Sequence, residues 1–297
     1  MSNTQNVSTT LLHFNDARAI QIANILGMPH LRINAHCFPD NESKITLPIV
    51  NTDSIAIYLS LDQPNSKLIE LMLTCATLQE SHHKPIILIA PYLCYMRQDI
   101  AFEIGEAVSQ KIIGRFLADY VTDIITVDPH LHRTAELTQA VPCEHAISLS
   151  SAGLQAEFLS KLHNNPILVG PDSESEQWVS QVAQLADLEY IIANKNRTGD
   201  HQVSITLPDA ELVGRTIILI DDIASTGQTL AGCAKLISQQ PVESIHALIT
   251  HALFNDDAET IMHQAGIEAI WSTDSIQHST NHISLAPILA EALKAYC

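Results

Sequence analysis

Two adjacent aspartates and a hydroxyl-rich turn follow an aliphatic run in the second half of the chain. The run, residues 217–220, predicts a buried parallel strand because it lacks the polar alternation of a half-exposed one. Asp221 and Asp222 follow, then Ser-Thr-Gly-Gln-Thr at 225–229, then helical apolar spacing over 229–238. Small residues at a helix N-terminus favour a phosphate, whereas carboxylates repel phosphate and suit sugar hydroxyls or a metal. The segment therefore predicts a ligand with a phosphate and hydroxyls; a plain strand-turn-helix connection with a Ser or Thr cap is the alternative.

Polar residues also stand at the ends of other strand-like runs. They are Phe38, Asp40 and Glu42 in HCFPDNES, Arg97, Gln98 and Asp99 in YMRQD, Asp128, His130 and His132 in TVDPHLHR, and Asp172 and Glu174 in VGPDSES. Each cluster alone is equally consistent with turn chemistry. Because ligands of open α/β sheets bind outside the carboxyl ends of the strands, their recurrence predicts a functional site.

A pair of cations stands on a polar segment in the second half. Lys195 and Arg197 lie beside a Gly-Asp turn, in a chain with only 15 basic residues. Such a pair can close over the charge that develops on phosphate oxygens during phosphoryl-type transfer, which needs positioning and neutralisation more than covalent chemistry. The alternative is a solvated hairpin without a role in chemistry.

The order of strand-like and helix-like segments predicts two similar α/β halves, each a mostly parallel sheet flanked by helices. Aliphatic runs typical of buried strands occupy residues 54–61, 85–93, 123–131, 166–172, 216–222 and 244–254, and amphipathic stretches such as 66–81 and 176–188 lie between them. With 297 residues and about 150 per domain, we expect domains at 1–145 and 146–297. The sequence leaves open which half the last helix, within 285–297, packs against.

Composition narrows the partners. The net charge of −18, from 33 acidic and 15 basic residues, disfavours binding to nucleic acid or to an anionic membrane. No apolar run approaches the roughly 20 residues that span a bilayer, and the first ten residues do not resemble a signal peptide. The six cysteines form no CxxC pair, so we expect reduced thiols in a cytoplasmic protein.

Taken together, the motifs resemble those of the ribose-phosphate diphosphokinases, the synthetases of phosphoribosyl diphosphate. Roughly residues 11–295 carry them in the family's order: FPDxE, YxRQD, DxH, GPD, Lys-x-Arg and DDxxxTxxT. Each motif is unspecific by itself, but six in register over two α/β halves are a strong signal. The resemblance implies two tandem phosphoribosyltransferase-like domains. It also implies transfer of the diphosphoryl group of MgATP to the anomeric hydroxyl of ribose 5-phosphate, with release of AMP.

The resemblance also implies a role for each matched residue. The ATP-binding positions would be Phe38, Asp40, Asn41 and Glu42, on a loop that reaches a neighbouring subunit of a homo-oligomer (a dimer or a multiple of dimers), together with Arg97, Gln98 and Asp99. The ribose 5-phosphate positions would be Arg197, Asp221, Asp222, Ser225, Thr226, Gly227, Gln228 and Thr229. Lys195 and Arg197 would form the catalytic loop, and His130 and Asp172 the Mg²⁺-linked pair. Because Mg²⁺ prefers oxygen ligands, His130 is better suited to contact through water.

Three departures from the common family pattern indicate a variant subgroup. Asn41 stands where better-known members have Gly, and Asn tolerates a left-handed backbone better than most residues. Ser225 replaces an Asp, which removes one carboxylate near the ribose but keeps a hydroxyl for phosphate. Residues 100–109 lack the basic stretch of regulated members, so inherited control by ADP or phosphate is not predicted.

Two other functions compete with the synthetase. A phosphoribosyltransferase that consumes the same diphosphate shares the DDxxxTGxT loop, but such enzymes usually have one domain and lack the RQD and FPDxE elements. A catalytically silent, regulatory relative would be favoured by loss of Lys195 or Arg197, and both are present.

Overall fold

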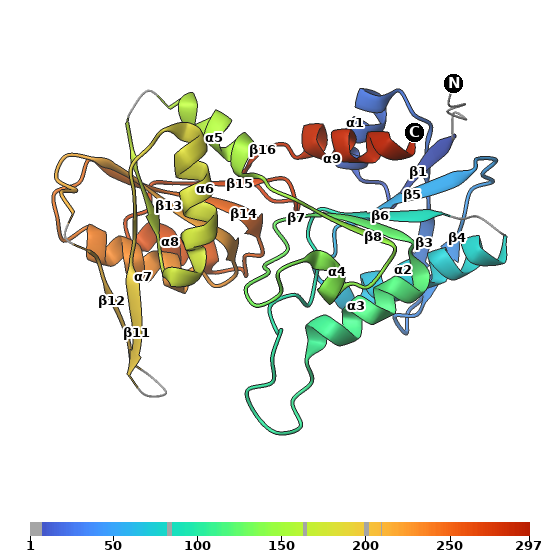
Figure 1. Ribbon diagram of the computed structural model, residues 1–297, viewed down its shortest axis with the longest axis horizontal. Coiled ribbons are helices and arrows are strands. Elements are labelled where there is room, and N and C mark those ends of the chain that lie inside the picture. The colour runs from blue at the N-terminus through green and yellow to red at the C-terminus, as the bar shows by residue number, and fades with distance from the viewer. Residues whose placement is uncertain (1–7, 82–84, 163–164, 199–201, 209) are drawn as a thin grey trace. The chain divides into compact units, whose positions relative to one another are not determined.

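The computed structural model describes residues 8–81, 85–162, 165–198, 202–208 and 210–297 (Figure 1). The chain forms two compact units. The first comprises Met1–Leu149 and Leu285–Cys297, and the second comprises Ser150–Ser284. The division therefore falls a few residues after the expected boundary at 145/146.

The first unit is built on a six-stranded sheet in which every strand pair is parallel. The strand order is β2 (His30–Arg32), β1 (Thr9–His13), β5 (Ser54–Tyr58), β6 (Ile86–Ala90), β7 (Asp123–Val127) and β8 (His145–Leu149). Its helices are α1 (Ala17–Leu26), α2 (Pro64–Glu80), α3 (Ser109–Tyr120), α4 (Leu137–Ala140) and α9 (Ala286–Leu293), and an antiparallel hairpin joins β3 (Asn34–Cys37) to β4 (Ser43–Thr46).

The second unit repeats this plan. Its parallel sheet has the order β10 (Tyr190–Ile192), β9 (Ile167–Gly170), β13 (Thr216–Ala224), β14 (Ser244–Ala252), β15 (Ala269–Thr273) and β16 (Asn281–Ile283). Its helices are α5 (Ala152–Ser160), α6 (Glu176–Ala186), α7 (Gln228–Ile237) and α8 (Ala258–Gln264), and its hairpin joins β11 (Asn194–Thr198) to β12 (Gln202–Thr206). In both units the hairpin lies along the chain between the second and the third strand of the parallel sheet. The predicted fold, two tandem α/β units with parallel sheets, is confirmed.

The last helix settles the question that the sequence left open. Helix α9 packs against α1 in the first unit. The 3₁₀ turn after it (Lys294–Tyr296) adds a hydrogen bond of 2.9 Å, in which the Tyr296 hydroxyl donates to Asp123 Oδ1 on β7. The chain thus returns to its first unit, and the second unit takes α5, which packs against α6.

Alternation along the central strands explains why these aliphatic runs are continuous. On β13, Ile217 and Leu219 join the core cluster that contains Leu230 and Ala234 of α7. Ile218 and Ile220 join the opposite cluster, which contains Val179 and Val182 of α6. Successive side chains of a strand point to opposite faces, so helices on both faces demand apolar residues at every position.

The cysteines agree with the sequence expectation. All six are free thiols, and burial raises the pKa of Cys75, Cys94 and Cys233 to about 12. These three thiols remain protonated at neutral pH and act as small apolar core residues. Within the described ranges, no helix combines the length and the apolar character needed to cross a membrane.

Candidate active site

The two aspartates of the second unit lie on β13 itself, which continues two residues beyond the predicted end at 222. Asp222 is 2% exposed and Asp221 is half-buried, and the backbone N–H of Asp222 donates to Asp221 Oδ1 at 3.0 Å. Burial, followed by the negative charges of Asp222 and Asp172, raises the pKa of Asp221 well above its ordinary value. The strand end therefore holds a carboxyl group that favours a proton, a hydroxyl donor or a cation beside it.

Asp172 joins this group from the neighbouring strand. It follows β9, which pairs with β13, and its carboxylate caps the 3₁₀ turn Ser173–Ser175 by accepting from the backbone N–H of Glu174 at 3.2 Å. Since Asp172 contributes to the raised pKa of Asp221, the two motifs that the sequence placed at separate strand ends meet at one edge of the sheet.

The hydroxyl-rich turn leads directly into α7. Gly227 is the N-cap residue and has a φ of 69°, in the left-handed region that favours glycine. A Cβ added there would lie 2.9 Å from Met262 Cγ and 3.0 Å from the backbone oxygen of Ala258. Glycine is therefore required twice, for its backbone angle and for the close approach of α8.

The first turn of α7 has the features of an anion site. The first N–H groups of a helix have no partner within the helix and carry the positive end of its dipole. Thr226 and Gln228 are exposed, and the Thr226 hydroxyl accepts from the Gln228 N–H at 3.4 Å. From behind, the backbone N–H of Asn255 donates to the Ser225 carbonyl at 3.0 Å and fixes the start of the turn.

The Lys-x-Arg segment forms one strand of the β11–β12 hairpin, in which Lys195 pairs with Ile205 and Arg197 with Val203. The backbone of both cationic residues is described, but their side chains and residues 199–201 lie outside the described part of the chain. Their assignment as catalytic residues stays a prediction.

In the first unit, the FPDNE motif occupies the tip of the β3–β4 hairpin. The Phe38 N–H donates to the Glu42 carbonyl at 2.8 Å, and the Asn41 N–H donates to the Phe38 carbonyl at 2.9 Å. Asn41 has a φ of 69°, which agrees with the reason given for Asn at this position. The Asp40 carboxylate accepts from the Glu42 N–H at 3.2 Å. Phe38 is 40% exposed, so its ring is open to a stacking partner.

The RQD motif lies after β6, in the segment that leads toward α3. Arg97 is exposed, whereas the amide of Gln98 accepts from the Ser109 hydroxyl at 2.8 Å and donates to Glu106 at 2.9 Å. Asp99 forms an ion pair of 2.9 Å with Arg133, which directly follows the DPHLH motif. The structure thus brings together two motifs that are separated in sequence.

The DPHLH motif has a strained backbone. Asp128 and His130 have φ values of 38° and 52°, which cost free energy for residues other than glycine and are common at functional sites. The Nε2 atoms of His130 and His132 lie 2.9 Å apart. No set of three or more His, Cys, Asp or Glu side chains that could hold a metal ion is found among the described residues. His130 belongs to the first unit and Asp172 to the second.

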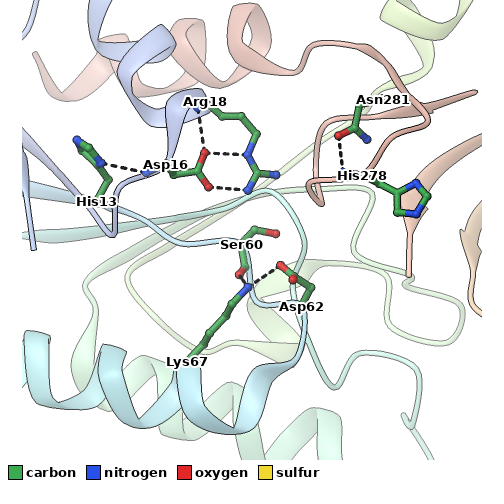
Figure 2. Close-up of polar contacts among 8 residues, drawn as sticks. All are labelled: His13, Asp16, Arg18, Ser60, Asp62, Lys67, His278 and Asn281. Carbon is green, nitrogen blue, oxygen red and sulfur yellow. Dashed lines mark hydrogen bonds and ion pairs between the residues drawn. The ribbon is translucent and has the colours of Figure 1, made fainter. Parts of the chain in front are cut away.

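The first unit has its own counterpart of the phosphate turn, between β5 and α2 (Figure 2). There the Lys67 ammonium donates to the Ser60 carbonyl at 2.8 Å and to Asp62 Oδ1 at 2.7 Å. Gln63 precedes the helix with a φ of 50°, and Pro64 is the first helical residue. The residue before the helix is left-handed in both units, but the first unit's turn holds a cation.

Sequence reasoning missed several supporting residues. Asn255, Ala258 and Met262 back the turn at 225–229, and Arg133, Thr134 and Gln110 connect the RQD and DPHLH segments. Arg133 could have been found because it flanks a motif. The others belong to ordinary helix or loop patterns, and only their positions in space give them a role.

Comparisons with known proteins show the family to which the chain is similar. Residues 11–120 match the N-terminal domain of ribose phosphate pyrophosphokinase, and residues 149–285 match the phosphoribosyl transferase domain. The ribose-phosphate pyrophosphokinase of Methanopyrus kandleri is 29% identical over 86% of this chain and 88% of its own length. That of Methanothermobacter thermautotrophicus is 28% identical over 93% and 96%. The crystal structure of phosphoribosylpyrophosphate synthetase from Mycobacterium smegmatis has the same fold, with a TM-score of 0.84 at 20% identity over 97% and 98% of the two chains.

Proposed function

Because the chain belongs to the ribose-phosphate pyrophosphokinase family, we propose that it transfers the diphosphoryl group of MgATP to the anomeric hydroxyl of ribose 5-phosphate. The products are 5-phosphoribosyl 1-diphosphate and AMP. The observation that carries this proposal is the short turn at the end of β13, which leads from Asp221 and Asp222 directly into the N-terminus of α7. A sugar phosphate offers the matching pair of groups, an anion for the turn and hydroxyls for the carboxylates.

The turn from Ser225 to Thr229 binds the 5-phosphate. Its exposed Thr226 hydroxyl and the N–H groups at the start of α7 donate hydrogen bonds, and the helix dipole favours the anion. These contacts exist before and after the reaction, so they supply binding and orientation more than acceleration of the chemical step.

Asp221 and Asp222 bind the ribose hydroxyls. Hydroxyl groups donate to carboxylates, and each bond offsets part of the burial and of the neighbouring negative charge that raise the pKa of Asp221. Holding the ring at two points, the phosphate and the hydroxyls, fixes the anomeric oxygen for attack on the β-phosphorus of ATP.

Magnesium fits the chemistry of the donors at the end of β13. Mg²⁺ is usually held by one or two carboxylates together with substrate phosphates, and a cation near Asp172 would offset the crowding of negative charge around Asp221. When bound, the ion neutralises the charge of the ATP phosphates. In the second unit Asp172 would hold such an ion, and in the first unit His130 would contact the Mg²⁺ of MgATP through water.

Lys195 and Arg197 stabilise the charge that develops on the transferred group, and Arg197 also contacts the ribose 5-phosphate. Phosphoryl-type transfer needs little covalent assistance, so cations placed at the phosphate oxygens supply most of the acceleration. Support for this role comes from the polar hairpin that carries both residues and from family membership.

The nucleotide contacts come from the first unit. The open ring of Phe38 stacks on adenine, Asp40 and Glu42 accept from its edge, and Asn41 keeps the turn that presents them. Arg97, Gln98 and Asp99 contact ATP or order the segment that does. If the hairpin serves ATP on a neighbouring copy, the active protein is a homo-oligomer, at least a dimer.

A single assay tests the proposed function. The purified protein is incubated with MgATP and ribose 5-phosphate, and the nucleotide products are separated. AMP should form only when both the sugar phosphate and a divalent metal are present. ADP as the product, or AMP without the sugar phosphate, would contradict diphosphoryl transfer.

A further inference from the structure

Gln110 is the second residue of α3, and it is only 1% exposed. Its backbone N–H donates to the carbonyl of Gln98 at 3.2 Å, and its side-chain Nε2 donates to the carbonyl of Met96, also at 3.2 Å. These two carbonyls lie on either side of Arg97. One buried residue therefore fixes the backbone of the exposed arginine from both ends.

The remaining polar atom of the same side chain reaches a second motif. Gln110 Oε1 accepts from the Thr134 hydroxyl at 3.2 Å, and Thr134 lies four residues after His130, in the loop that follows DPHLH. The Arg133–Asp99 ion pair links the same two segments, but Arg133 is 53% exposed, and exposed pairs contribute little. Gln110 is thus the buried connection between the segments of Arg97 and His130.

Other contacts of the segment are more open to water. The Glu106 carboxylate accepts from Gln98 Nε2 and from the N–H groups of Phe102 and Glu103, and these bonds lie at the surface. Water can replace a surface bond when it breaks, whereas a buried donor or acceptor that loses its partner stays unsatisfied. The bonds of Gln110 therefore have the larger effect on the position of Arg97.

We propose that Gln110 is a positioning residue for ATP: it holds the Arg97 segment and the His130 loop in one fixed arrangement. The inference rests on the proposed function, in which Arg97 contacts ATP and His130 is linked to its magnesium. In this proposal Gln110 itself contacts neither ATP nor the magnesium ion. It acts through the carbonyls of Met96 and Gln98 and through Thr134.

Loss of the Gln110 side chain should weaken ATP binding selectively. In Gln110→Ala the Met96 carbonyl and the Thr134 hydroxyl lose their partner, and both segments relax. We expect the KM for MgATP to rise about tenfold, because two hydrogen bonds are lost and each contributes roughly 0.5–1.5 kcal/mol. The KM for ribose 5-phosphate should stay within about twofold, because its turn lies in the second unit.

Two further variants separate the arms of the side chain. Gln110→Glu keeps the acceptor for Thr134 but cannot donate to the Met96 carbonyl, and Thr134→Val removes only the other arm. Because a carboxylate would stand against the Met96 carbonyl at a buried position, Gln110→Glu should raise the KM for MgATP at least as much as Gln110→Ala, whereas Thr134→Val should raise it less. The double variant Gln110→Ala with Thr134→Val should be no worse than Gln110→Ala, because the Thr134 bond is already lost.

Gln79 provides a matched control. Its side-chain amide also donates to a backbone carbonyl, that of Tyr120 at the other end of α3, at 3.1 Å. Gln79→Ala should leave both KM values unchanged. If the KM for MgATP and the KM for ribose 5-phosphate rose together in both Gln110→Ala and Gln79→Ala, the effect would be a general structural one, and the proposal would be overturned.

The experiment measures both KM values and the affinity for MgATP by equilibrium dialysis, at a temperature where every variant is folded by circular dichroism. A selective rise in the KM and the Kd for MgATP supports the proposal. If the native protein forms AMP and Gln110→Ala has an unchanged KM for MgATP, the positioning role fails while the proposed function stands. If the native protein binds MgATP but forms no AMP, the proposed function fails, and the Kd still decides the role of Gln110.

Discussion

The turns after β5 and β13 occupy the same place in two sheets of the same strand order, yet their polar groups are arranged differently. The turn after β13 ends in Gly227 and presents helix N–H groups. The turn after β5 ends in Gln63 and Pro64, which removes an N–H, and Lys67 closes it by binding the Ser60 carbonyl and Asp62 (Figure 2). The two turns therefore share a left-handed residue before the helix, but the turn after β13 has the features of an anion site and the turn after β5 is closed by a lysine.

The acidic residues after the first strand of each sheet differ in the same way. Asp16 caps α1, and its carboxylate binds the Arg18 guanidinium, with Nη2 at 2.5 Å from Oδ2 (Figure 2). The Arg18 guanidinium also lies 5.6 Å from the centre of the Tyr58 ring at the end of β5. Asp172, after β9, instead adds to the negative charge around Asp221. The carboxylate after the first strand of the first unit is thus paired with a nearby cation, whereas the corresponding carboxylate of the second unit adds to the negative charge that raises the pKa of Asp221.

The largest difference between the units should appear at their hairpins. Lys195→Ala on β11 should lower kcat by about 10³-fold or more with little change in either KM, because its contact forms in the transition state. Lys44→Ala on β4, an exposed lysine of the first hairpin, should change kcat by no more than about twofold. Steady-state kinetics of both variants checks this. Near-native turnover of Lys195→Ala would contradict a catalytic role of Lys195 on the second hairpin.

The second-largest difference should appear when the left-handed residue before each helix, Gly227 or Gln63, is substituted. Gly227→Ala meets an unfavourable φ and the backbone of Ala258, so it should cost about 1–3 kcal/mol of stability and raise the KM for ribose 5-phosphate at least about tenfold. Gln63→Gly relieves the same backbone angle, so we expect stabilisation of up to about 1 kcal/mol and unchanged kinetics. Denaturant unfolding and kinetics measure both, and an equal kinetic response of the two turns would contradict the distinction.

The smallest predicted effects are changes in the free energy of unfolding, and they should have opposite signs for Asp221→Asn and Asp16→Asn. Burial and neighbouring charge raise the folded-state pKa of Asp221, so its ionised form destabilises the folded protein once the pH exceeds the unfolded-state pKa, about 3.9. Asp221→Asn should therefore stabilise the ligand-free protein at pH 7 by on the order of 1 kcal/mol while impairing activity. This gain should disappear as the pH falls toward 4.

The matched change in the first unit is Asp16→Asn. It keeps a side chain that can cap α1 but loses the charge that binds Arg18, so it should destabilise by about 0.5–1 kcal/mol at pH 7. Free energies of unfolding of both variants at pH 4 and pH 7 give the test. Destabilisation by Asp221→Asn at pH 7 would show that its carboxylate is compensated within the protein.

Much of the fold followed from local pattern. The continuous aliphatic run before Asp221 required helices on both faces of its strand, and the alternation of such runs with amphipathic stretches predicted the parallel sheets. The packing of α9 on α1 could not be predicted, because a short apolar helix fits either half equally well.

The candidate site could be predicted from the sequence at positions where local backbone geometry restricts the residue type. Gly227 and the aspartates are recognisable because a turn and a strand end restrict which residues fit. Gln110 was not recognisable, since a glutamine near the start of a helix is ordinary in sequence and its role depends on loops that are distant along the chain. The internal closure of the first turn by Lys67 was equally hidden, because the sequence does not reveal which oxygen atoms a lysine reaches.

The stoichiometry of ribose 5-phosphate binding tests the central claim most directly. Equilibrium dialysis with labelled sugar phosphate, in the presence of Mg²⁺ and AMP, should give one site per chain. Thr226→Val, which removes the turn's exposed hydroxyl, should weaken that site roughly 10- to 150-fold, the effect of losing a hydrogen bond to a charged group. Lys67→Met, in the first unit's turn, should leave it unchanged. Two sites per chain, or weakening by Lys67→Met instead of Thr226→Val, would contradict the assignment of phosphate binding to the second unit alone.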